Sequence, residues 1–129
     1  MATDMLKSIA CLMLGGAFGA LSRWGLHFWI DAKWGANTHF PWGILLVNVV
    51  GCFLFGWLFT IFEGRGWFSD AVQLAVFTGF LGSFTTFSTF GWNTLELLRM
   101  GHVGMALGNV GASVLLGLLA VWAGFSLGR

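Results

Sequence analysis

The sequence predicts an all-α integral membrane protein with four transmembrane helices, and three observations lead to that class. Of the 129 residues, 57% are hydrophobic and only 9% are charged, whereas ordinary soluble domains carry about 25% charged residues. Small soluble domains leave much of their surface in water, so a chain of this length has no interior large enough for so many apolar side chains. Four apolar stretches cover nearly the whole chain, each long enough to cross a bilayer.

The four stretches are separated by short segments that contain most of the charges. We expect spans at about residues 8–30, 42–62, 71–98 and 103–127, within a single domain covering 1–129. The second span has no charged residue and follows Pro41, which has no backbone N–H to lose at a helix start. A cleaved signal peptide is an alternative for the first span, because Lys7 precedes an apolar run that ends in small residues. Asp4 in the leader favours a retained helix instead.

The third span combines glycines with a cluster of hydroxyl residues: Thr78, Ser83, Thr85, Thr86, Ser88 and Thr89. Glycine and threonine lower helix propensity, and hydroxyls compete for backbone carbonyls, so we expect this helix to break between Gly82 and Thr86. Non-helical backbone within a membrane must lie against protein, water or an ion. The freed carbonyls of residues such as Gly82 and Thr85 are therefore candidates for coordinating a hard cation.

Phenylalanines are interleaved with these hydroxyls. Phe80, Phe84 and Phe87 share one face of a regular helix, and Phe90 lies about 60° beyond. An aromatic stripe at this spacing is usually a packing surface, but the hydroxyls and the expected break favour a lining role. A benzene ring has a positive edge, so rings presented edge-on stabilise a small anion without a fixed charge that would trap it.

Three further polar residues lie within the expected spans, where polar groups are expensive and often functional. Asn48 either lines the mouth of a pore or makes an interhelical hydrogen bond. Ser113 is a weaker donor candidate, because a lone serine in a membrane usually bonds its own helix backbone. Arg23 either reaches the interface or holds a positive potential over a vestibule.

The groups that are missing from the sequence limit the possible functions. No Asp or Glu lies centrally in a span, whereas a proton-coupled exporter of this size is expected to need an intramembrane carboxylate. This favours passive anion conduction. No phosphate loop, zinc-binding spacing or nucleophile elbow is present, so we expect no enzyme, and a net charge of +1 argues against a nucleic-acid partner. From Cys11 and Cys52, within the spans, we infer neither a disulfide nor a metal site.

The basic residues give almost no preference for one orientation in the membrane. One side holds Lys7, Arg65 and Arg129, and the other holds Lys33 and Arg99, with Arg23 near its end. Because Lys and Arg in short loops set orientation, such a chain inserts both ways round, and we expect an antiparallel homodimer. Small-residue faces at Gly15-xxx-Gly19 and Gly104-xxx-Gly108-xxx-Ala112 either pack that dimer or pack helices within one subunit.

The chain resembles the CrcB/Fluc family of fluoride channels over essentially its whole length. The resemblance is carried by Gly15-xxx-Gly19-xxx-Arg23, Pro41-Trp42-Gly43, Val47-Asn48-Val49-Val50-Gly51, Thr78-Gly79-Phe80-Leu81-Gly82, Thr85-Thr86-Phe87-Ser88-Thr89-Phe90 and Gly111-Ala112-Ser113. It implies a dual-topology antiparallel dimer in the bacterial inner membrane, with two pores selective for fluoride over chloride. It also implies a central sodium ion held by main-chain oxygens, which match Gly82 and Thr85 here.

The same resemblance assigns roles to individual residues. It implies that Phe87 and Phe90 line the pore, that Asn48 lies at a vestibule, and that Ser113 and Thr89 belong to a polar track. The chain departs from the family pattern at Ile44, where threonine is common, at Asn109, where some relatives have tyrosine, and at Asn93, where a carboxylate is frequent and here Glu96 follows one turn later.

The leading hypothesis is therefore passive export of fluoride, and two alternatives from other classes remain. One is a small dual-topology multidrug exporter, against which the missing intramembrane carboxylate counts. The other is a membrane assembly subunit that transports nothing.

Overall fold

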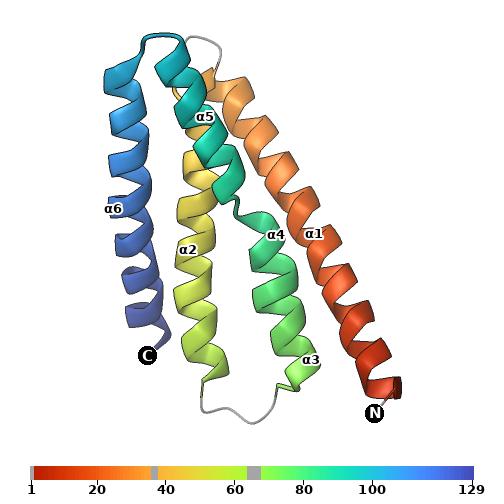
Figure 1. The fold of residues 1–129 in the computed structure, drawn as a ribbon. Coiled ribbons are helices and arrows are strands. Elements are labelled where there is room, and N and C mark those ends of the chain that lie inside the picture. Colours follow the sequence, from red (N-terminus) through yellow and green to blue (C-terminus); the bar gives the residue numbers. More distant parts are fainter. Residues whose placement is uncertain (1, 36–37, 64–67) are drawn as a thin grey trace.

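The computed structural model describes residues 2–35, 38–63 and 68–129, and these residues form helices and contain no strand (Figure 1). The elements are α1 (Ala2–Trp34), α2 (Trp42–Phe62), α3 (Asp70–Gln73), the π-helix η2 (Leu74–Leu81), α4 (Gly82–Phe84), α5 (Phe87–Arg99) and α6 (Val103–Gly128). Within this described part of the chain, four stretches are long and apolar enough to cross a membrane: Thr3–Trp34, Trp42–Phe62, Asp70–Arg99 and Val103–Gly128. The prediction of four spans is confirmed.

The first helix is longer than the span expected at 8–30. It continues to Trp34, because a helix need not end where its apolar stretch ends, and Lys33 in its last turn has the sign that the helix dipole favours. The Lys33 Nζ also lies 4.7 Å from the centre of the Trp29 ring. Residues 36–37 and 64–67, including Arg65 of the expected second loop, lie outside the described part of the chain.

The third span consists of consecutive helical pieces. α3 passes into η2, whose π geometry the sequence did not predict, and η2 passes into α4. The backbone is then extended at Thr85 (φ −81°, ψ 157°) and Thr86 (φ −150°, ψ 113°) before α5 begins. Gly82 remains helical, so only the last two residues of the interval expected to break leave helical geometry.

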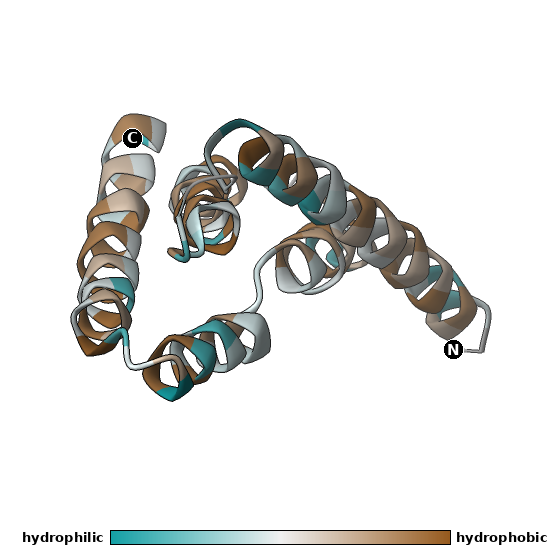
Figure 2. Ribbon diagram, turned by 90° about the horizontal axis from the view of Figure 1, so that it is seen from above, coloured by the Kyte–Doolittle hydropathy of each residue, from teal (hydrophilic) through white to brown (hydrophobic). Residues whose placement is uncertain are grey.

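The helices form an open arrangement in which α6 packs on α2 and α1 packs on η2, with α1 and α6 at opposite edges (Figures 1 and 2). Small residues allow the close approach of α1. A Cβ at Gly15 would overlap the carbonyl oxygen of Ala75, and a Cβ at Gly19 would overlap that of Phe80. These two glycines therefore pack helices within one chain. By contrast, a Cβ at Gly104 would meet no atom within 4 Å.

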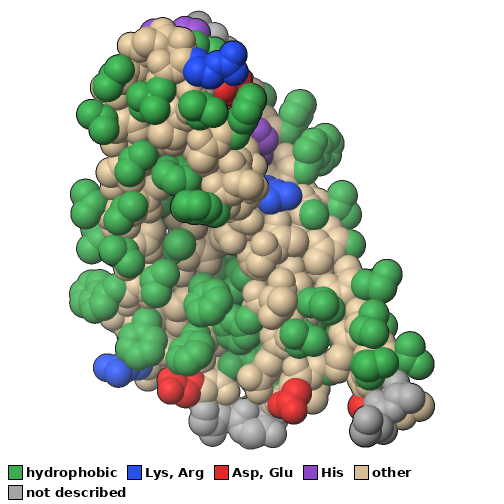
Figure 3. Space-filling view, viewed as in Figure 1, with side chains coloured by type: hydrophobic (Ala, Val, Ile, Leu, Met, Phe, Trp, Pro, Cys, Tyr) green, Lys and Arg blue, Asp and Glu red, His purple; other side chains and the backbone are tan. Residues whose placement is uncertain are grey.

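Apolar side chains cover much of the outer surface, and the charged side chains in this view gather mainly at the two ends (Figure 3). Large exposed side chains include Phe18, Trp24, Leu115 and Trp122, whereas Val47 and Asn109 are the largest fully buried ones. A soluble protein rarely exposes so much contiguous apolar surface. The chain is a multi-pass membrane protein, with the start of α1 and the end of α6 at the same end of the molecule (Figure 1).

Candidate functional site

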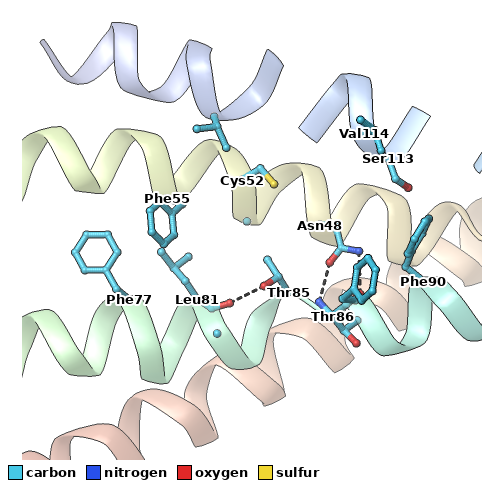
Figure 4. Close-up of a pocket in the computed structure, with 14 residues that line it drawn as sticks. Asn48, Cys52, Phe55, Phe77, Leu81, Thr85, Thr86, Phe90, Ser113 and Val114 are labelled. Atoms are coloured by element: carbon cyan, nitrogen blue, oxygen red, sulfur yellow. Dashed lines mark hydrogen bonds between the residues drawn. The ribbon is translucent and has the colours of Figure 1, made fainter. Parts of the chain in front are cut away.

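A cavity of about 420 Å³ lies between α2, α6 and the interrupted third span (Figure 4). Its wall includes six of the eight residues to which the sequence analysis gave a role in the site: Asn48, Gly82, Thr85, Phe87, Phe90 and Ser113. The remaining lining residues are Gly51, Cys52, Phe55, Phe77, Leu81, Thr86, Val114 and Val121. None of these residues is charged, so the described wall of the cavity is neutral.

Asn48 on α2 holds the backbone of the break. Its Oδ1 accepts a hydrogen bond from the Thr86 N–H at 2.8 Å, and its Nδ2 donates to the Thr86 carbonyl at 3.1 Å. The side-chain amide thus supplies partners that the extended backbone at Thr86 does not find within its own helix. Of the two roles considered for Asn48, the interhelical hydrogen bond is present in the structure, and the same residue also lines the cavity. Its second Nδ2 N–H makes no bond within the described residues.

Thr86 is also the residue at which α5 begins. Its Oγ1 accepts a hydrogen bond from the Thr89 N–H at 3.2 Å, which satisfies one of the free donors at the start of the helix. The Thr86 hydroxyl also lies 3.0 Å from the Thr89 Oγ1. Thr89 itself does not line the cavity. The role of Thr86 was not foreseen, although a threonine directly before a helical segment is a recognised signal for a helix start.

Gly51 brings α2 against the residues at the break. A Cβ at Gly51 would overlap the Thr85 Cγ2 and lie 3.2 Å from the Phe84 Cδ1. On its other side, Thr85 is fixed by its own turn, because its Oγ1 donates to the Leu81 carbonyl at 2.9 Å. Sequence reasoning gave Gly51 no role in the site, and only its spacing of three residues from Asn48, on the same side of the helix, pointed to it.

The four phenylalanines that the sequence singled out in the third span separate into two pairs. Phe80 and Phe84 stack with ring centres 5.7 Å apart, and Phe84 is buried. Phe87 and Phe90 lie 5.5 Å apart with ring planes inclined by 40°, and both line the cavity. The expectation that Phe80, Phe84 and Phe87 share one face is wrong, because the extended residues between α4 and α5 interrupt the regular helix that it assumed. In the single chain the Phe87 side chain is 84% exposed.

Ser113 presents an unused hydroxyl to the cavity. Its Oγ points from α6 toward the side on which Phe90 lies, and it makes no hydrogen bond within the described residues (Figure 4). This differs from Ser126 on the same helix, whose Oγ donates to the Trp122 carbonyl at 2.8 Å. The bond to its own helix that is usual for a membrane serine is therefore not the arrangement at Ser113.

Arg23 does not line the cavity. It is half-buried on α1, and in the described part of the chain its guanidinium makes no hydrogen bond or ion pair. One turn along the helix, the Nδ1 of His27 lies 3.3 Å from the Oδ2 of Asp31. The vestibule role of Arg23 stays a prediction.

Two carbonyls at the break lack the N–H donors that a continuous helix would give them. The Thr86 N–H, which would bond the Gly82 carbonyl, bonds Asn48 instead, and the Thr89 N–H, which would bond the Thr85 carbonyl, bonds Thr86. These are the two carbonyls that the sequence singled out for a cation. Backbone oxygens are suitable ligands for hard cations. The described residues contain no cluster of three or more His, Cys, Asp or Glu side chains that could hold a metal ion.

The fold and the cavity together define a class of protein: a small multi-pass helical membrane protein with a neutral cavity of rings, hydroxyls and amide beside an interrupted helix. The chain belongs to the CrcB family, because the family model described as "CrcB-like protein, Camphor Resistance (CrcB)" matches residues 10–125.

Three curated relatives illustrate the similarity. The chain is 45% identical over 116 residues to the fluoride-specific ion channel FluC of Acidobacterium capsulatum, and the aligned residues cover 90% of this chain and 91% of the relative. It is 45% identical over 125 residues to the FluC of Parabacteroides distasonis, covering 97% and 94%. It is 42% identical over 125 residues to the FluC of Stutzerimonas stutzeri, covering 97% of both chains.

Proposed function

We propose that this protein is a fluoride-selective passive channel that exports cytoplasmic fluoride across the plasma membrane of a bacterium. Relatives that match nearly its whole length are named fluoride-specific ion channels. Hydrogen fluoride enters a cell from acid surroundings as a neutral molecule and dissociates inside. The trapped anion then leaves through the channel down its electrochemical gradient, without an enzymatic step.

The observation that carries this proposal is the neutral wall of the cavity. Phe87 and Phe90 bring two rings to it, and Ser113 brings a hydroxyl that has no partner in the described part of the chain. Ring edges carry partial positive charge, and a hydroxyl donates a hydrogen bond, so together they replace part of the water shell of a small anion. Because no Lys or Arg is among the lining residues, nothing there holds the anion too tightly to leave.

The two alternative functions find less support. A proton-coupled drug exporter requires a carboxylate that exchanges protons, and no carboxylate is among the lining residues of the cavity. If the protein were a subunit that transports nothing, the unbonded hydroxyl of Ser113 and the rings of Phe87 and Phe90 would have no evident role at a cavity within the spans.

We propose further that two copies assemble as an antiparallel dimer. The Phe87 side chain is 84% exposed in one chain, and an inverted second copy would cover it and close the cavity. The balanced distribution of Lys and Arg permits insertion in both orientations. The open face at Gly104 on α6 offers one surface where helices of two copies approach closely.

A sodium ion at the centre of this dimer is part of the proposal. The Gly82 and Thr85 carbonyls are freed from helical hydrogen bonds, and two copies contribute four such oxygens to an all-oxygen shell suited to a hard cation. The bound ion would stabilise the break rather than pass through the pore. Arg23 would hold a positive potential over the vestibule, and Thr89 would support the polar track through its bond to Thr86.

Ion release from liposomes tests the function directly. Purified protein is reconstituted into vesicles loaded with fluoride or with chloride, and each anion is followed with a selective electrode. We expect rapid fluoride release and chloride retention, with protein-free vesicles as the control. Equal release of chloride would end the claim of selectivity, and release of neither anion would end the claim of conduction. Uptake of a cationic drug driven by a pH gradient would support the exporter instead.

A further inference from the structure

A chain of two hydrogen bonds connects α6 to the residue that carries one of the cavity rings. Asn109 on α6 is 1% exposed, and its Nδ2 donates to the Thr94 Oγ1 at 2.9 Å. The Thr94 hydroxyl donates in turn to the backbone carbonyl of Phe90 at 2.8 Å. Neither Asn109 nor Thr94 lines the cavity, whereas Phe90 does.

The chemistry of the groups fixes the direction of these bonds. An amide nitrogen only donates, so the Thr94 oxygen accepts from Asn109 and directs its single proton to the Phe90 carbonyl. The bond from Asn109 is the one side-chain hydrogen bond between α5 and α6 among the residues that the structure describes. It is directional, whereas the apolar contacts between the helices are not.

The position of Asn109 relates this bond to the opposite wall of the cavity. Ser113 follows Asn109 by four residues on α6, so the two lie on the same side of that helix. A bond that fixes Asn109 to α5 therefore also fixes the distance between the Ser113 hydroxyl and the Phe90 ring.

Two side-chain amides from different helices thus hold α5. Asn48 of α2 bonds Thr86 at the start of α5, and Asn109 of α6 bonds Thr94 further along. Phe90 lies between these two points of attachment. Loss of either bond would let this segment shift relative to the wall that faces it.

We propose that Asn109 is a positioning residue that, through Thr94, sets the gap between the Phe90 ring and the Ser113 hydroxyl and so contributes to discrimination between fluoride and larger halides. The proposal rests on the fluoride conduction proposed above. A small anion loses its water shell only where ring edge and hydroxyl contact it together. A wider gap retains water and admits chloride.

Substitutions at Thr94 test this link with little change in volume. Thr94→Val removes the hydroxyl, Thr94→Ser keeps it, and Asn109→Leu removes the donor. We expect Thr94→Val and Asn109→Leu each to lower the fluoride-to-chloride flux ratio by about two- to tenfold, the effect of one lost hydrogen bond. Thr94→Ser should keep the ratio of the unmodified protein. Thr60→Val is the matched control, because the Thr60 Oγ1 donates to the Trp57 carbonyl of its own helix at 2.8 Å.

The combined variant separates a shared link from independent damage. Because both substitutions break the same chain of bonds, Thr94→Val with Asn109→Leu should lower the ratio no further than either change alone. Should Asn109→Leu not fold, the comparison of Thr94→Val with Thr94→Ser decides by itself. The proposal is overturned if Thr94→Val leaves the fluoride-to-chloride flux ratio unchanged, or if Thr60→Val lowers that ratio as much as Thr94→Val does. It is also overturned if the double variant folds and the losses in flux ratio from its two substitutions add.

Failure of the proposed function has a different signature. If the unmodified protein releases no fluoride, conduction is refuted and the positioning proposal is refuted with it. If the unmodified protein conducts and Phe90→Ile abolishes release while Thr94→Val changes nothing, conduction stands and only the positioning role of Asn109 fails.

Discussion

Replacement of Asn48 by leucine removes both hydrogen bonds to Thr86 while keeping a side chain of similar size. In the structure the amide accepts from the Thr86 N–H at 2.8 Å and donates to the Thr86 carbonyl at 3.1 Å. Leucine can do neither, so both backbone groups would be left without these partners within the spans. We expect Asn48→Leu to destabilise the protein and to lower fluoride release.

The expected magnitude follows from the burial of Thr86. Each buried backbone group that loses its partner costs about 1–3 kcal/mol. Thr86 is 7% exposed, but it also lines the cavity, where water relieves part of the penalty. The loss for the two groups together is therefore about 2–4 kcal/mol in the free energy of unfolding.

A denaturant titration in detergent measures this loss, and Cys52→Ala is the matched control. Cys52 lies one turn along α2 from Asn48, lines the same cavity, and makes no hydrogen bond within the described residues. Cys52→Ala should lower the free energy of unfolding by less than about 1 kcal/mol, because the side chain already borders a cavity and its loss only enlarges that space. If Asn48→Leu and Cys52→Ala differed by less than about 0.5 kcal/mol, the reasoning about the break would be refuted.

Three further predictions use the liposome assay. Phe87→Ile and Phe90→Ile should each abolish fluoride release without changing the elution volume of the protein; full release would return the rings to a packing role. Ser113→Ala should slow fluoride release by about two- to tenfold. Ser126→Ala, which loses only a bond to its own helix, should leave the release rate unchanged. Equal release rates in these two variants would contradict the assignment of Ser113. Replacement of sodium by a large organic cation should lower both the melting temperature and the release rate, and no change in either would count against the carbonyl site.

The spans could be predicted from the sequence because their boundaries depend on local composition. Charges and turn residues separate four apolar stretches, and α2 begins and ends at the residues expected. The π geometry of η2 could not be predicted in the same way. Gly79 lies in that segment, and a Cβ there would lie 2.9 Å from the Leu12 carbonyl oxygen on α1, so the local backbone faces a contact with a distant part of the chain.

The candidate site shows the same division between local and distant information. Low helix propensity at Gly82 and the following hydroxyls pointed to the region where α4 ends, and membrane depth pointed to Asn48 and Ser113. The sequence could not reveal that Asn48 bonds the backbone of Thr86, because that contact joins residues 38 positions apart. Arg23 does not line the cavity, and its predicted role over a vestibule stays a prediction.

An experimental structure of the purified protein in a lipid nanodisc with fluoride present tests the account most directly. We predict two oppositely oriented copies, with the edges of Phe87 and Phe90 facing an ion path that the Ser113 hydroxyl also lines. Rings that face the surrounding lipid, or two copies inserted in the same orientation, would contradict it.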